Sequence, residues 1–190
     1  MEITNLIVAR FADGRVLKGH TNDFVANRPL FHVEVEGTNQ VLELRCKQLK
    51  AVFFVKSLEG DPARQDLQGF VSGPAETSQG KKIAVRFKDG EFLCGYTLSW
   101  LPDREGFFLF PADAYSNNQR IYVITAATAE VKAGPAAEAL AQRVLGEQKQ
   151  SDAAAAGTPN VAAPPRPRLI AGPTGLRPRP NPPGRTGTDR

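Results

Sequence analysis

Residues 83–88 alternate between large apolar and small or charged side chains, which predicts a β-strand. Ile83, Val85 and Phe87 fall on one face of this period-two pattern. An Asp-Gly pair follows at once, and this pair favours a tight hairpin turn with a two-residue loop. An alternating strand, an Asp-Gly pair and a return strand also occur near the N-terminus, at 7–21. Two separate segments of the chain are therefore predicted to begin with the same hairpin.

These two hairpins belong to an internal repeat with an offset of 76 residues. The matched pairs are Arg10/Arg86, Phe11/Phe87, Asp13/Asp89, Gly14/Gly90, Leu17/Leu93, Gly19/Gly95, Thr21/Thr97 and Arg28/Arg104. Seven of these matches fall within twelve consecutive positions, so the chain contains two copies of one fold unit.

Each copy is predicted to be an all-β unit of five short strands. The expected strands are 7–11, 16–21, 30–35, 41–45 and 51–55 in the first copy, and 83–87, 92–97, 106–110, 120–125 and 129–132 in the second. Between the last two strands there is room only for a single 3₁₀ turn. This order predicts two tandem small five-stranded β-barrels, because closing each sheet removes its exposed edges.

The rest of the chain reads as connections and a tail. The predicted organisation is a first barrel at 1–56, a linker at 57–79, a second barrel at 80–133, a short helix at 134–150 and a disordered basic Pro-rich tail at 151–190. The linker is rich in Gly, Pro and polar residues. The tail lacks the apolar residues needed to form a core.

Two details of the hairpins stay open. A strict two-residue loop pairs Arg10 with Leu17, which puts an arginine and a core leucine on one face. Either a bulge shifts the register, or the arginine lies flat over the edge of the core. Gly19 and Gly95 lie inside their strands, where glycine indicates a bulge, a bend or a close approach of another backbone.

The formal charge of +4 is unevenly placed. Residues 1–133 hold 16 basic and 16 acidic residues, whereas 134–190 hold 8 basic and 4 acidic ones. The tail arginines that we single out are Arg166, Arg168, Arg177, Arg179 and Arg185. We therefore expect nucleic acid or an acidic protein surface, if either is a partner, to bind the tail first. The alternative is a solubilising tail without a fixed partner.

The segment VRFKDGEFLCGY (85–96) resembles the opening hairpin of Sm-like and SH3-like small barrels. Residues 4–132 as a whole resemble an uncharacterised bacterial family that pairs two such units. The shared phrases are LKAVFFVKSLEGDP at 49–62 and the motifs RFKDGE, GYT, PDR, GFFLFPAD and SNN between 86 and 118. The family resemblance implies the paired fold but no activity, cofactor or ligand.

The candidate binding residues in the folded part are arginines at matching positions and one tryptophan. Arg10 and Arg86, or Arg28 and Arg104, would contact an anion or nucleic acid, or else form structural salt bridges. Trp100 is either an exposed stacking residue or a seal between the units. The structural turn residues are Asp13, Gly14, Gly19, Asp89, Gly90 and Gly95. Two pairs of adjacent phenylalanines, at 53–54 and 107–108, predict that one barrel packs on the other.

The sequence argues for a non-enzymatic binding, adaptor or regulatory module. It contains no nucleophile, metal or phosphate-loop motif, which predicts no cofactor and no metal site. Cys46 and Cys94 read as reduced thiols, and no secretory signal or membrane span is visible, so a cytoplasmic protein is expected. The alternatives are an RNA-binding Sm-like protein and a PilZ-like cyclic-dinucleotide receptor. The sequence lacks the usual PilZ motif, because Arg10 and Arg15 do not have the spacing of the two arginines in that motif.

Overall fold

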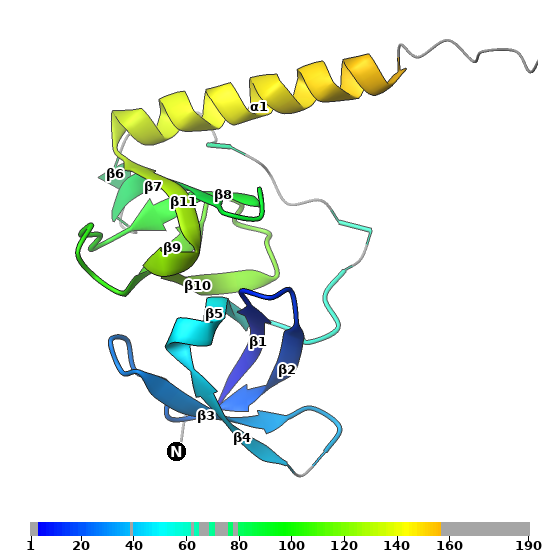
Figure 1. Cartoon of the computed structure of the whole chain (residues 1–190), viewed down its shortest axis with the longest axis vertical. Coiled ribbons are helices and arrows are strands. Elements are labelled where there is room, and N and C mark those ends of the chain that lie inside the picture. The colour runs from blue at the N-terminus through cyan, green and yellow to red at the C-terminus, as the bar shows by residue number, and fades with distance from the viewer. Residues whose placement is uncertain are drawn as a thin grey trace, which may run out of the picture. The chain divides into compact units, whose positions relative to one another are not determined.

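The computed structural model describes residues 4–38, 40–61, 63–64, 69–70, 76–77 and 80–156. These residues form antiparallel strands and, in the described part, a single α-helix (Figure 1). The first half comprises β1 (Asn5–Phe11), β2 (Val16–Thr21), β3 (Leu30–Val35), β4 (Val41–Arg45), η1 (Cys46–Gln48) and β5 (Leu49–Val55). The second half comprises β7 (Gly80–Phe87), β8 (Phe92–Thr97), β9 (Gly106–Pro111), β10 (Asn118–Ile124), η2 (Thr125–Ala127) and β11 (Thr128–Ala133). A two-residue strand, β6 (Glu76–Thr77), pairs with β7.

Both halves have the same strand order, as the repeat predicts. The order is β5-β1-β2-β3-β4 in the first half and β11-β7-β8-β9-β10 in the second. The predicted single 3₁₀ turn before the last strand is also present in each half, as η1 and η2. The duplication therefore extends beyond the opening hairpin to the whole unit.

The two halves are joined edge to edge, because β10 pairs with β5. The result is one ten-strand antiparallel path that ends at β4 and at β11. The sheet is not closed, so the prediction of two tandem closed barrels is not confirmed. Strand pairing between the halves has taken the place of closure within each half, and it protects β5 and β10 from being exposed edges.

Of the two joining strands, β5 is buried on both faces along its whole length, and β10 is buried from Ile121 to Ile124. Every residue of β5 is buried, and its side chains alternate between two hydrophobic clusters. Val52 and Phe54 belong to the core of the first half, together with Ile7 and Phe31. The cluster of the second half contains Ala51, Phe53, Val55, Ile83, Val85, Phe107, Ile121 and Val123. A strand between two cores needs no polar face, which explains the apolar run of β5.

The same arrangement explains the adjacent phenylalanines. Phe53 packs in the core of the second half and Phe54 in that of the first. Phe107 belongs to the second core, while Phe108 packs against the first. The prediction that the outward ring of each pair packs on the other half is confirmed.

The hairpin turns are one residue longer than predicted. Arg10 pairs with Val16, and the N–H of Phe11 donates to the carbonyl of Arg15 at 2.8 Å. Three residues therefore form the loop, with Gly14 in the left-handed region at φ +91°. Such a loop ends in a left-handed glycine bulge. The shifted register puts Leu17 against the core and Arg10 on the outer face, so the first of our two alternatives is correct.

Gly19 and Gly95 allow a close approach of neighbouring backbone. A Cβ at Gly19 would lie 2.1 Å from the carbonyl oxygen of Glu34. At Gly95 the same distance, 2.1 Å, separates it from the carbonyl oxygen of Phe110. Glycine is therefore required at both positions because no side chain fits.

The helix α1 (Pro135–Ala156) packs on the outer face of β7 and β8 (Figure 1). Ala137, Leu140, Ala141 and Val144 form its buried stripe, with the spacing of one helical face. No helix in the described part of the chain is long and apolar enough to cross a membrane.

Candidate functional site

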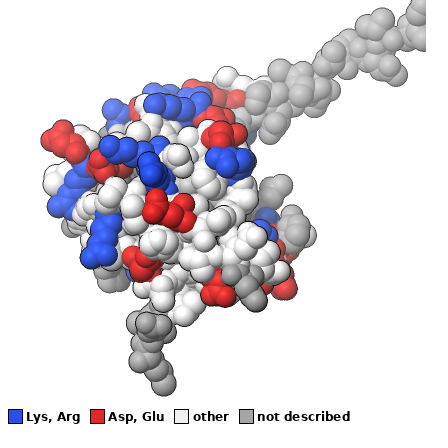
Figure 2. All heavy atoms as spheres, turned by 60° about the horizontal axis from the view of Figure 1, so that its bottom comes forward, with Lys and Arg blue, Asp and Glu red and all other residues white. Residues whose placement is uncertain are grey.

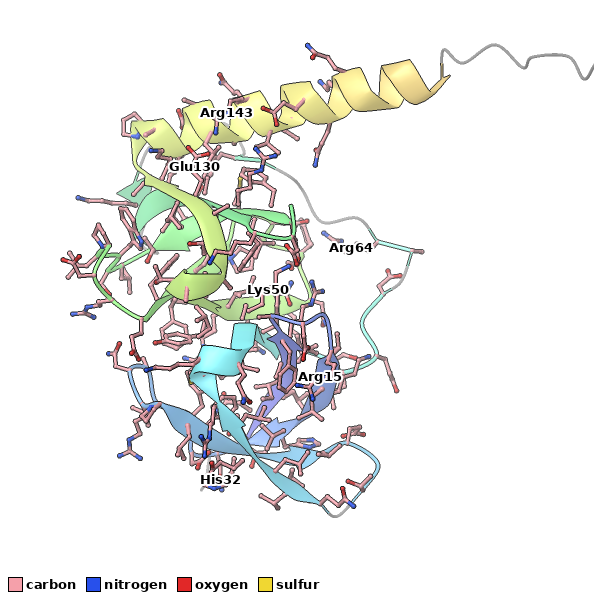
Figure 3. All side chains as sticks on the ribbon, in the orientation of Figure 1. Arg15, His32, Lys50, Arg64, Glu130 and Arg143 are labelled. Atoms are coloured by element: carbon pink, nitrogen blue, oxygen red, sulfur yellow. The ribbon has the colours of Figure 1, made fainter. Side chains whose placement is uncertain are left out.

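Arg10 takes part in an ion-pair cluster that joins the two halves. Its guanidinium lies 2.8 Å from the carboxylate of Glu91 and 4.5 Å from the centre of the Phe53 ring. Lys50 of β5 contacts the carboxylates of both Asp89 and Glu91. Figure 3 shows Lys50 at the level where the halves meet. The side chain of Lys50 is 7% exposed, so its charge is largely removed from water.

This cluster affects the titration of Asp89. The hydrogen bond from Lys50 is the main reason why the pKa of the Asp89 carboxyl lies below its ordinary value. Asp89 was predicted only as a turn residue. The structure gives it a second role, because its carboxylate ties the β7–β8 turn of the second half to β5 of the first.

Arg86 is the counterpart of Arg10, and it also faces a glutamate. Its guanidinium lies 3.6 Å from Glu147 of α1. Nearby, the buried Lys82 contacts Glu138 at the beginning of the helix, and Arg143 of the helix contacts Glu130 of β11 (Figure 3). The pairings of Arg10 and Arg86 favour the structural role for both arginines.

Trp100 is partly buried and caps the core of the second half. Its ring lies 6.5 Å from that of Phe107, edge to face, and it packs on the second hydrophobic cluster. In the first half the matching residue, Phe24, packs edge to face on Phe31. The repeat therefore places an aromatic cap at this loop position in both halves. The indole N–H of Trp100 is buried without a hydrogen-bond partner in the described part.

Arg28 and Arg104 differ from the other predicted arginines. Their main-chain carbonyls accept hydrogen bonds, from the Cys46 thiol at 3.3 Å and the Thr125 hydroxyl at 2.8 Å. Neither guanidinium has a hydrogen bond or ion pair within the described residues. These two arginines therefore remain available for a ligand.

The remaining predicted site residues belong either to the hairpin turns or to the C-terminal tail. Asp13 accepts the Arg15 N–H at 3.1 Å and pairs with its guanidinium at 2.8 Å, and these contacts hold the pKa of Asp13 below its ordinary value. Gly90 repeats the left-handed turn of Gly14, at φ +90°. The tail arginines, Arg166, Arg168, Arg177, Arg179 and Arg185, lie outside the described residues.

A groove of about 560 Å³ opens where the halves meet. We call it the junction groove. Its apolar lining consists of Val8, Phe11, Val16, Phe53, Val55 and Leu58. Charged side chains stand around it, among them Arg10, Lys18, Lys50, Asp89 and Glu91. Lys18 is fixed beside it by a hydrogen bond to the carbonyl of Leu58, at 2.7 Å.

The junction groove matches the surface that α1 covers in the second half. The helix packs on Ala84, Phe92 and Cys94. With the repeat offset of 76 residues, the counterparts of these residues are Val8, Val16 and Lys18, in that order. All three counterparts line the junction groove. The same face of the unit therefore carries a helix in one half and an open groove in the other.

Sequence reasoning did not find this groove. Val8 and Val16 read as ordinary strand residues, and Lys50 as a residue of a tight turn. The repeat itself could have indicated the groove. Phe92 is an outward apolar residue that α1 covers, and its counterpart 76 residues earlier, Val16, is 55% exposed.

Charges of both signs are mixed over the body. In the view of Figure 2, acidic and basic side chains alternate with neutral surface, and neither sign forms a broad patch. Within the part that the structure describes, no group of three or more His, Cys, Asp or Glu side chains is placed to hold a metal ion.

The fold and the groove define a β-rich domain made of two matching halves. Residues 4–134 match a family of unknown function (DUF6982), and the chain belongs to this family. No curated protein and no solved structure matches the chain.

Proposed function

We propose that this protein is a non-enzymatic adaptor whose junction groove binds an amphipathic helix of a partner protein. The proposal depends on one observation. The face of the second half that corresponds to the groove carries α1, whose apolar stripe packs on it. The two faces derive from the same repeat. The uncovered one keeps apolar residues, Val8 and Val16, at two of the three positions on which α1 packs, while Lys18 stands at the third. This pattern supports an amphipathic helix as the occupant.

The contacts of α1 show which partner residues such a face selects. Two small residues, Ala137 and Ala141, let the helix approach closely, and Leu140 and Val144 fill the spaces beside them. In the junction groove the exposed Val16 would meet the equivalent residues of a partner. A helix with two small and two branched apolar residues along one stripe fits this surface.

The other two predicted functions receive less support from the described residues. RNA binding in the Sm manner would depend on the tail arginines, because residues 1–133 have no net charge. The PilZ-like alternative considered Arg10 and Arg15 as phosphate ligands, whereas these two arginines pair with Glu91 and Asp13. The adaptor role is also consistent with a cytoplasmic setting, in which Cys46 and Cys94 remain thiols.

Site-specific photo-cross-linking tests the proposal. A photoreactive phenylalanine replaces Val16 in the full-length protein, and the cross-linked partner peptide is identified by mass spectrometry. Val25 is the matched control, because it is also an exposed valine, 47% accessible, but lies outside the groove. We expect a defined peptide from position 16 and none from position 25.

A synthetic copy of the captured peptide gives the decisive measurement. It should become helical on binding, as circular dichroism would show, and Val16→Glu should weaken binding at least tenfold while Val25→Glu does not. The proposal is wrong if position 16 captures no defined peptide, if the peptide binds without forming a helix, or if both variants bind it equally.

A further inference from the structure

A second cavity, of about 230 Å³, lies at another part of the junction. We call it the Arg28 pocket. Its lining residues are Asn27, Arg28, Cys46, Lys47, Glu105, Tyr122, Ile124 and Ala126. It shares no residue with the junction groove, and the adaptor role makes no use of it. Its size suits a small molecule rather than a protein segment.

The inner wall of the pocket is buried and uncharged. Tyr122 is 3% exposed, and its ring packs closely on the Cα of Gly106. Cys46 and Ile124 are also buried. Burial, aided by the nearby Glu105, raises the pKa of the Cys46 thiol, and burial likewise raises the pKa of Tyr122. Both groups are therefore neutral near pH 7, and neither repels an anion.

One hydrogen-bond donor on this wall is unused. The Tyr122 oxygen accepts the N–H of Asn27 at 3.2 Å, and its own hydroxyl hydrogen has no acceptor among the described residues. Arg28 is exposed and lies at the mouth of the pocket, where its guanidinium has no hydrogen bond or ion pair within the described residues. A buried donor without an acceptor costs free energy in the empty protein. An acceptor atom in the pocket would remove this cost.

The backbone at the pocket is held in an uncommon conformation. Asn27 has φ +69°, and it is the one non-glycine residue of the described chain with a positive φ. This conformation aims the N–H of Asn27 at the Tyr122 oxygen, which leaves only the hydroxyl hydrogen of Tyr122 to be satisfied. Asparagine adopts this conformation more readily than other non-glycine residues, so the turn holds this hydrogen bond in the empty protein.

The mouth of the pocket favours a single negative charge. Arg28 and Lys47 bring two positive charges, and Glu105 brings one negative charge. Lys47 and Glu105 are 3.9 Å apart and largely exposed, so they partly neutralise each other. The net charge of these three side chains is +1, which a single carboxylate balances and a doubly charged phosphate exceeds. The planar guanidinium of Arg28 can bind such a carboxylate through two parallel hydrogen bonds.

We propose that the Arg28 pocket binds a small monocarboxylate with an apolar body. The carboxylate accepts hydrogen bonds from the Arg28 guanidinium and the Tyr122 hydroxyl. The apolar body lies against Ile124 and Ala126, which line the pocket.

Sodium benzoate is a suitable probe, with benzamide as its neutral analogue of the same shape. Both are titrated at millimolar concentration into the ¹⁵N-labelled full-length protein. We expect benzoate to shift the amide signals of Asn27 and Ala126, and benzamide to bind at least tenfold more weakly. Arg28→Ala should weaken benzoate binding about 10- to 100-fold, the range for a hydrogen bond to a charged group. Tyr122→Phe should weaken it less.

Arg45→Ala is the matched control, because Arg45 is an exposed arginine outside the pocket. This variant should bind benzoate as the wild type does, and the spectra themselves show whether each variant is folded. The proposal fails if benzoate leaves the signals of the pocket unchanged, if benzamide binds equally well, or if Arg28→Ala and Arg45→Ala have the same affinity. None of these results bears on the binding of a helix to the junction groove.

Discussion

The guanidinium of Arg10 lies 2.8 Å from the carboxylate of Glu91, across the boundary between the two halves. The matching arginine, Arg86, lies 3.6 Å from Glu147 of α1. In each half, therefore, a glutamate from a neighbouring element lies beside the same arginine. For the first half this element is the β7–β8 turn, and for the second half it is α1.

Removing the carboxylates around Lys50 should destabilise the protein strongly. Asp89→Asn together with Glu91→Gln leaves the Lys50 ammonium without an acidic partner among the described residues. A buried charge that loses its partners costs about 3–5 kcal/mol. Urea unfolding, followed by the fluorescence of Trp100, measures this loss.

A third substitution separates charge burial from simple loss of contacts. Lys50→Met in the same background removes the buried charge and keeps an apolar chain on Phe87, whose ring centre lies 4.5 Å from the Lys50 nitrogen. Most of the lost stability should return. If the double variant is as stable as the wild type, or the triple variant less stable than the double, the cluster does not join the halves in this way.

Acid should weaken the same contact. The pKa of Asp89 is lowered in the folded protein, mainly by Lys50. Its contribution to stability is therefore fully present above the ordinary pKa of about 3.8 and is lost as the pH falls through the lower folded value. The free-energy difference between the wild type and Asp89→Asn should shrink between pH 5 and pH 2.5.

Asp89 is more than half exposed, so this pH effect should be modest. The same comparison in the Lys50→Met background serves as the control, and there the difference should depend less on pH, because the main cause of the lowered pKa of Asp89 is absent. Urea unfolding at several pH values gives both differences. A constant difference for Asp89→Asn would contradict the assigned role of Lys50.

Much of the fold follows from local patterns in the sequence. The repeat predicted that the two halves share one fold, and their common strand order agrees with this. The turn signals are local, because Asp13-Gly14 and Asp89-Gly90 form left-handed turns within their own hairpins. A helix at 134–150 was expected for a similar reason, since Leu140 and Val144 lie on one stripe. The prediction that disorder begins at residue 151 was wrong, because α1 continues to Ala156. The turn was predicted one residue too short, because an Asp-Gly pair suits both two- and three-residue loops.

The joining of the halves could not be read from the same patterns. The pairing of β5 with β10 depends on contacts between residues about 70 positions apart, such as Val52 with Tyr122. The apolar run in β5 showed that both its faces are buried but not what buries them. The two cavities were missed for the same reason, because their residues come from both halves.

Glycine at position 95 should be indispensable. A Cβ there would lie 2.1 Å from the carbonyl oxygen of Phe110, so Gly95→Ala forces the β8–β9 pair apart. We expect a loss of several kcal/mol or failure to fold. Gly146→Ala is the opposite case, because no atom lies within 4 Å of its added Cβ. In a helix this change should stabilise by about 0.8–1 kcal/mol. Thermal unfolding compares the two, and equal melting temperatures would contradict the close approach.

Reactivity of Cys94 should report whether α1 is docked. Burial raises the pKa of the Cys94 thiol to about 12, and α1 packs on it. At pH 8 only about one thiol in ten thousand is then ionised, so alkylation by iodoacetamide should be very slow. Leu140→Asp puts a charge into the buried stripe and should release the helix.

Mass spectrometry after timed alkylation measures Cys94 and Cys46 in the same molecule. In the Leu140→Asp variant the rate at Cys94 should rise at least tenfold, because the thiol gains water and its pKa falls toward the ordinary value of 9.0. The rate at Cys46, which lies in η1 and away from the helix, should not change and serves as the internal control. If both cysteines accelerate together, the substitution has loosened the whole domain. If neither does, α1 does not protect this face of β8.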